Sequence, residues 1–155
     1  MYFPIFVSLE HKKCVVIGGG IIAVRRVRTL LKFCDHITVI SPSVCPEMEN
    51  VIKENKITYF SRCYQPGDGK DVFLLAACTN DRAVNHQAGE EAKASGAFVS
   101  VADCKEECNF LFPGIAAEEE SGAVIGVCAS GKNHSLAKKL TGQCRELLKG
   151  QCNLK

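Results

Sequence analysis

The sequence has almost no net charge and no long apolar run. Its 19 basic and 17 acidic side chains leave a formal net charge of +2, so binding to nucleic acid through bulk positive charge is not indicated. A membrane span needs about 20 consecutive apolar residues, and no stretch approaches that length. We therefore expect a protein that binds neither nucleic acid nor a membrane.

The start of the sequence also lacks the features of a secretory signal. MYFPIFVSLEHKK contains neither a basic start nor a long apolar stretch. Ten cysteines are nevertheless present, and Cys14, Cys78 and Cys128 lie in apolar, strand-like runs. Small buried thiols explain these positions better than an extracellular disulfide framework. We therefore expect a cytoplasmic protein with reduced cysteines.

A matched set of metal-ligating residues is missing as well. Cys104 and Cys108 are four residues apart in a polar stretch, a spacing that can place two thiolates on one helical face. A zinc or iron–sulfur site normally needs four protein ligands, and no second such pair follows. We interpret His11, His36 and His86 as surface or strand-edge residues, and we predict no resident metal.

What the sequence does contain is an alternation of apolar runs with segments of helical periodicity. Strands are predicted at 12–19, 36–42, 56–64, 72–79 and 97–103, and helices at 21–33, 45–55 and 82–95. Strands that alternate with helices predict an α/β fold with a doubly wound parallel sheet.

The pattern changes after Asp103. Segments 109–119 and 122–130 resemble two strands of an antiparallel hairpin, and 135–150 has the periodicity of an amphipathic helix. Its apolar stripe consists of Leu136, Leu140, Cys144, Leu147 and Leu148. We therefore predict a first domain over 1–113 and a smaller segment over 114–150.

A triple glycine connects the first predicted strand to the first predicted helix. Gly18, Gly19 and Gly20, followed by Ile21, Ile22 and Ala23, fit the pattern G-x-G-x-x-G/A in the context that makes it informative. Gly18 permits a tight turn, Gly20 lets a diphosphate approach the backbone, and helix N–H groups then face the phosphates. The alternative is a plain strand–helix turn.

The second predicted strand lacks the acid that usually binds the ribose of NAD. Ser41, Pro42 and Ser43 follow it instead, and the hydroxyl of Ser41 or Ser43 could bond a ribose hydroxyl. No arginine is present there to bind the 2′-phosphate of NADP. The residues themselves leave NAD and NADP open.

Four motifs in order resemble a known family. They are YFPIFVSLEHKKCVVIGGGIIAVRRVRTLL, AACTNDRAVN, SVADCKEECNFLFPGI and VCASGKNHSLAKKL. The likeness covers residues 2–148 and is to the precorrin-2 dehydrogenase / sirohydrochlorin ferrochelatase family, which includes the N-terminal domain of siroheme synthase. It implies a Rossmann-like NAD-binding fold and NAD-dependent dehydrogenation of precorrin-2 to sirohydrochlorin in siroheme synthesis. It also implies ferrochelatase activity in some members, and a homodimer built through the C-terminal segment.

The resemblance also implies roles for particular residues. The essential acid of the family corresponds to Asp103, which follows the fifth predicted strand at the sheet edge where such folds bind ligands. The alternative for Asp103 is a cap for the CKEEC segment. The nucleotide contacts of the family correspond to Ile21, Ile22, Pro42 and Ser43, and by its position Thr79 is expected beside the nicotinamide.

The substrate of this family, precorrin-2, carries many carboxylates. Lys132, in a loop of small residues, is the best single cation to bind one of them. Asn133 and His134 stand where the family has Ser-Pro, in a loop that the resemblance places beside the tetrapyrrole. His134 could hold a ferrous or cobaltous substrate ion or accept a pyrrole proton. Two alternatives stay open, which are a nucleotide-sensing regulatory module and a chelatase without dehydrogenase activity.

Overall fold

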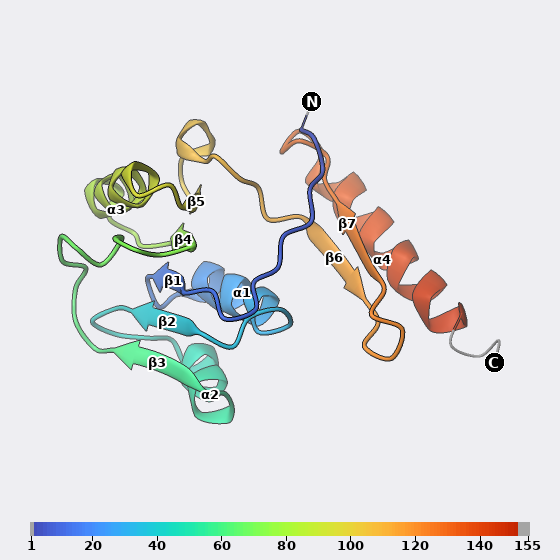
Figure 1. Cartoon of the computed structure of the whole chain (residues 1–155), viewed down its shortest axis with the longest axis horizontal. Helices are drawn as coiled ribbons and strands as arrows, with labels where there is room; N and C mark the ends of the chain where they lie inside the picture. The colour runs from blue at the N-terminus through green and yellow to red at the C-terminus, as the bar shows by residue number, and fades with distance from the viewer. Residues whose placement is uncertain (1, 152–155) are drawn as a thin grey trace. The chain divides into compact units, whose positions relative to one another are not determined.

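The computed structural model describes residues 2–151 and divides them into two compact units. Residues 7–110 form the larger unit, and the described residues before Val7 and after Phe110 form the smaller one (Figure 1). The elements of the larger unit are β1 (Cys14–Ile17), α1 (Ile21–Leu30), β2 (Ile37–Ile40), α2 (Pro46–Glu54), β3 (Ile57–Phe60), β4 (Leu74–Ala77), α3 (Arg82–Ala94), β5 (Phe98–Val101) and the 3-10 turn η1 (Lys105–Glu107). The smaller unit contains β6 (Gly114–Ala117), β7 (Val124–Val127) and α4 (His134–Gln151).

The five strands of the larger unit form one parallel sheet in the order β3-β2-β1-β4-β5. This order reverses direction after β1, which is the arrangement of a Rossmann-type doubly wound sheet. The predicted fold class is therefore confirmed. Because all strands are parallel, their carboxyl ends lie along one edge of the sheet and their amino ends along the other.

Both faces of the sheet are buried. Alternate residues of β1, β4 and β5 pack against Ala88 and Ala92 of α3 in one apolar cluster. The side chains between them, such as Cys14 and Val16, point to the opposite face, where α1 and α2 pack against each other. Right-handed crossovers on the two sides of a reversal place helices on opposite faces. The apolar strand runs of the sequence follow from this double coverage.

The connection from β3 to β4 contains no helix. Arg62 donates two hydrogen bonds of 2.7 Å to the Asp68 carboxylate within this loop. Glu91 of α3 accepts the backbone N–H groups of Gly67 at 2.6 Å and Gly69 at 2.8 Å, and the Tyr64 hydroxyl at 2.9 Å. One carboxylate on α3 therefore attaches this crossover to the body of the unit.

In the smaller unit, β6 and β7 form the predicted antiparallel hairpin, and α4 packs on it. Gly114 allows the close contact, because a Cβ there would collide with the side chain of Thr141. Arg145 donates hydrogen bonds to the carbonyl of Ile115 at 3.0 and 3.2 Å. None of the helices within residues 2–151 has the length and apolar character of a membrane-spanning segment.

Two sequence predictions need correction. The strand predicted at 109–119 begins only at Gly114, because Asn109 bonds the edge of β5 instead, accepting from Val99 N–H at 2.6 Å and donating to the Ala97 carbonyl at 2.8 Å. Cys128 is exposed, because it follows the end of β7. Cys14 and Cys78 are buried, as predicted.

Candidate functional site

The first glycine of the loop is required by the fold. Gly18 has φ +115°, a conformation that L side chains rarely adopt, and a Cβ there would lie 2.5 Å from the Cys78 carbonyl oxygen. Its N–H donates to the carbonyl of Ile40 at 2.8 Å. Gly18 thus lies between the ends of β2 and β4, where no side chain fits.

The second glycine packs against the loop that follows β2. A Cβ on Gly19 would collide with the Ser43 carbonyl and come within 2.9 Å of the Ser41 hydroxyl oxygen. The N–H of Cys45 donates to the Gly19 carbonyl at 2.9 Å. The glycine loop and the loop over 41–45 therefore hold each other in place.

The third glycine differs, because nothing lies within 4 Å of the position that its Cβ would occupy. Gly20 is the N-cap of α1 and offers no side-chain cap, so it leaves the first N–H groups of the helix without a side-chain partner from this position. Ile21 and Ile22 in the first turn are 47% and 48% exposed. An open cradle of N–H groups beside exposed apolar side chains fits a diphosphate and the flat groups attached to it.

The residues after β2 divide into buried and exposed positions. Ser41 is 7% exposed, and its hydroxyl donates to the Ser43 carbonyl at 2.6 Å. Tyr59 donates to the Ser41 carbonyl at 3.0 Å. Ser41 thus supports the loop from inside, while Pro42 and Ser43 are exposed beside the glycine cradle.

Thr79, two residues beyond β4, is held by a residue to which the sequence analysis gave no role. Asn85 of α3 is fully buried, and its amide accepts the Thr79 N–H at 2.9 Å and donates to the Thr79 carbonyl at 3.0 Å. The Thr79 hydroxyl lies 2.8 Å from Asn85 Oδ1 and 2.9 Å from the Asp81 carbonyl. The motif AACTNDRAVN includes this asparagine, and its spacing of six from Thr79 was the available signal.

Asp103 is exposed two residues beyond β5, at the same sheet edge as the glycine loop. It does not cap the turn that follows, because Cys104 is the N-cap of η1 and η1 has no side-chain cap. The negative charge of Asp103 interacts with the buried thiol of Cys78, the residue before Thr79. Burial raises the pKa of Cys78 to about 11, Arg26 opposes this shift through a hydrogen bond and its charge, and Asp103 adds to it.

A charged group lies next to Asp103 on η1 and α3. The Glu107 carboxylate accepts from Arg82 and lies 2.8 Å from His86 Nδ1. Hydrogen bonding to Glu107 raises the pKa of Arg82, to which Asp103 also contributes. Arg82 thus places a positive charge near the exposed acid.

The remaining predicted residues belong to the smaller unit. Lys132 lies in the turn before α4, and Asn133 accepts the N–H of Leu136 at 2.8 Å, so Asn133 caps this helix. His134 is the first residue of α4 and is exposed. A shallow hollow on α4 is lined by Ser135, Lys138, Lys139, Gly142, Gln143 and Glu146.

The predicted nucleotide residues and Asp103 therefore share one edge of the sheet. A family model described as "Putative NAD(P)-binding" matches residues 5–114 of the chain. The chain belongs to this NAD(P)-binding family.

Relatives of known name extend this finding. The chain is 42% identical over 146 residues to the "Probable multifunctional siroheme biosynthesis protein HemA" of Ruminiclostridium josui, covering 94% of this chain and 28% of the relative. It is 32% identical over 147 residues to the siroheme synthase of Ruthia magnifica subsp. Calyptogena magnifica, covering 95% and 31%. The resemblance that the motifs indicated is thereby confirmed. The chain spans less than a third of the length of these relatives.

A solved structure shares the fold. The protein named "SirC, precorrin-2 dehydrogenase" superposes with a TM-score of 0.75 at 23% identity, covering 92% of this chain and 69% of the other. At this identity the likeness concerns the fold alone.

Proposed function

We propose that the chain binds NAD and oxidises precorrin-2 to sirohydrochlorin. The observation that carries this proposal is the open N–H cradle at Gly20, which shares a sheet edge with the exposed carboxylate of Asp103. Membership of an NAD(P)-binding family and relatives named for siroheme synthesis support the same conclusion.

The residues at the edge fit a dinucleotide. The diphosphate would contact the N–H groups at Gly20 and the start of α1, and Ile21, Ile22 and Pro42 would pack on the attached rings. Thr79, fixed by Asn85, would lie beside the nicotinamide. We propose NAD rather than NADP because residues 41–46 contain no Lys or Arg to bind a 2′-phosphate.

The reaction removes one hydride and one proton from precorrin-2. The nicotinamide, when bound, supplies the hydride acceptor, and NADH and a proton leave with sirohydrochlorin. The carboxylate of Asp103 would take the proton from the macrocycle. Arg82, whose charge interacts with Asp103, would pair with a carboxylate of the substrate.

The test uses the purified chain with precorrin-2 and NAD, followed by absorbance. We expect Asp103→Asn to lower turnover at least about 100-fold, because general-base catalysis contributes about that much or more. Its NAD dissociation constant should stay within about twofold of the wild type. Glu106→Gln is the matched control, since it removes an exposed acid from η1, and it should keep full turnover. Full turnover in Asp103→Asn would contradict the role of this residue.

The same assay separates the alternatives. A nucleotide-sensing module would bind NAD without any turnover, and a chelatase alone would insert ferrous or cobaltous ion into sirohydrochlorin without needing NAD.

We propose that the chain also acts as a ferrochelatase, and iron insertion into supplied sirohydrochlorin tests this separately. Turnover with NADP at the same kcat/KM as with NAD would contradict the cofactor choice.

We further propose that residues 1–113 bind the cofactor and that residues 114–150 form a dimerisation and substrate-capping segment. Leu136, Leu140 and Leu147 of α4 are 45%, 39% and 59% exposed, which supports contact with a second copy. In this proposal Lys132, Asn133 and His134 contact the tetrapyrrole. Light scattering should give twice the mass of one chain, and a monomer at assay concentration would contradict the dimer.

A further inference from the structure

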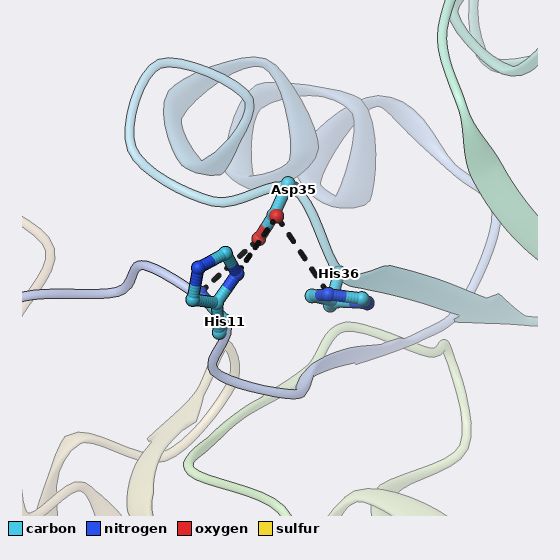
Figure 2. A group of neighbouring side chains, drawn as sticks. All are labelled: His11, Asp35 and His36. Atoms are coloured by element: carbon cyan, nitrogen blue, oxygen red, sulfur yellow. Dashed lines mark hydrogen bonds and ion pairs between the residues drawn. The ribbon is translucent and has the colours of Figure 1, made fainter.

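A second polar cluster lies at the opposite edge of the sheet, away from the glycine loop. It consists of His11, Asp35 and His36, whose ligand atoms all lie within 4.8 Å of one another. Figure 2 shows the two imidazoles on either side of the Asp35 carboxylate. The proposed reaction gives these residues no role.

The topology of the sheet brings the two histidines together. His36 immediately precedes β2, and His11 lies three residues before β1. The two strands are parallel neighbours with Cys14 opposite Ile37, so their amino ends are adjacent. The N–H of Cys14 donates to the His36 carbonyl at 3.0 Å. This hydrogen bond fixes the register between the segments that lead into β1 and β2.

The backbone around His11 orients the carboxylate. His11 adopts φ +57°, which is uncommon for a residue with a side chain, and its N–H donates to Asp35 Oδ1 at 3.2 Å. The Cys34 thiol donates to the Lys12 carbonyl at 3.2 Å and joins the same two segments. One oxygen of Asp35 is thus held by the backbone, while the other faces both imidazoles.

The distances around this second oxygen match the requirements of a small cation. Asp35 Oδ2 lies 3.3 Å from His11 Nδ1 and 3.6 Å from His36 Nε2. Ligand bonds of about 2.0–2.1 Å in tetrahedral geometry place neighbouring ligand atoms about 3.4 Å apart. The other nitrogen of His11, Nε2, lies 3.7 Å from Glu10 Oε1. This separation is longer than a hydrogen bond, so the Glu10 carboxylate adds negative charge near the imidazole without fixing its orientation.

We propose that His11, Asp35 and His36 bind a divalent transition-metal ion such as Zn²⁺ or Ni²⁺. Two imidazoles and one carboxylate suit this class of ion, whereas Mg²⁺ and Ca²⁺ prefer oxygen ligands alone. The side chains of His11, Asp35 and His36 are 74%, 55% and 62% exposed, so an ion reaches them directly from solvent and water completes its coordination. An exposed ion pair alone contributes little to stability and gives no reason for this convergence.

The test is isothermal titration calorimetry, in which the whole chain is titrated with Zn²⁺, and separately with Ni²⁺, without cofactor. It measures the dissociation constant of each ion. Exposed thiols would compete, so the titration uses a Cys63→Ser, Cys128→Ser background. We expect saturable binding that weakens at least about tenfold in His11→Asn, in His36→Ala and in Asp35→Asn. Asparagine is chosen at position 11 because it tolerates positive φ. His86→Ala is the control and should bind as tightly as the background.

Amide NMR spectra with Zn²⁺ give a second readout that does not depend on the variants folding. The N–H signals of His11, Asp35 and His36 should change most, and those of residues 18–22 should not change. Two outcomes would overturn the proposal. They are the absence of saturable binding by the background protein, and binding with unchanged affinity in folded variants or with shifts confined to other residues.

Discussion

We assign a binding site to each edge of the parallel sheet, and the two proposed sites use different parts of the chain. At the carboxyl edge, Gly20 leaves the first N–H groups of α1 without a side-chain cap, and nothing lies within 4 Å of the position of its Cβ. At the amino edge, the side chains of His11, Asp35 and His36 converge. A backbone site needs glycines at fixed spacing and leaves a motif in the sequence. A side-chain site built from separate segments leaves none.

The carboxyl edge itself contains a second contrast, between its first and third glycines. Gly18 is enclosed by the ends of two strands, whereas a Cβ added at Gly20 would have nothing within 4 Å. Two glycines of one motif therefore have separable purposes. The first serves the fold, and we assign the third to the ligand.

Gly18→Ala should have the largest effect on stability. The methyl group would meet the Cys78 carbonyl at 2.5 Å, in a backbone conformation with φ +115°. We expect a loss of about 3 kcal/mol or more in the free energy of unfolding, because steric overlap adds to backbone strain. Urea denaturation measures it. A loss below about 1 kcal/mol would mean that the loop is free to move, and the contrast with Gly20 would disappear.

Glu91→Gln should have the next largest effect, since Glu91 holds the crossover that carries the chain from the carboxyl edge back to the amino edge. Burial raises the pKa of Glu91, but hydrogen bonds from Gly69, Gly67 and Tyr64 outweigh this and hold the pKa below its usual value. The carboxylate therefore contributes stability above about pH 4.3, the unfolded value, and that contribution is lost as pH falls through the lower folded pKa.

We therefore expect Glu91→Gln to cost about 1–2 kcal/mol at neutral pH and to flatten the loss of stability in acid. Urea melts between pH 7 and pH 3 measure both quantities. Glu90→Gln is the neighbouring control, because Glu90 is exposed and pairs only with Lys93 among the contacts seen, so it should leave the acid profile unchanged. An unchanged profile in Glu91→Gln would show that the crossover is held by other contacts.

Much of the carboxyl edge could be predicted from the sequence because its signals are local. Apolar runs, the alternation of strand and helix, and the triple glycine each lie within a few neighbouring residues. Parallel pairing then brings the ends of β1, β2, β4 and β5 to one edge without any long-range information. The position of Asp103 beyond β5 follows from the same rule.

The features that the sequence did not predict depend on contacts between distant segments. His11 and His36 are individually ordinary surface residues, and only the pairing of β1 with β2 makes them neighbours. In the sequence, Asn85 is one polar residue of a predicted helix, and only the structure shows that it is buried against Thr79. Cys128 followed an apolar run that suggested burial, but it lies beyond the end of β7. Local patterns contain none of this information.

Gly20→Val should have the smallest effect on stability and therefore gives the sharpest test of the carboxyl edge. Its side chain would enter open space at φ −87°, so we expect the free energy of unfolding to change by no more than about 1 kcal/mol. The same side chain would fill the cradle in front of the α1 N–H groups. NAD binding, measured by calorimetry, should weaken at least about 100-fold, because the diphosphate could no longer approach the backbone.

Gly142→Ala provides the matched control for Gly20→Val. Nothing lies within 4 Å of the Cβ position at Gly142 either, but this residue belongs to α4 in the smaller unit. Alanine inside a helix should stabilise the chain by about 1 kcal/mol and leave NAD affinity unchanged. If Gly20→Val bound NAD as tightly as Gly142→Ala, then the open space at Gly20 would not be where the diphosphate binds, and the contrast with Gly18 would concern packing alone.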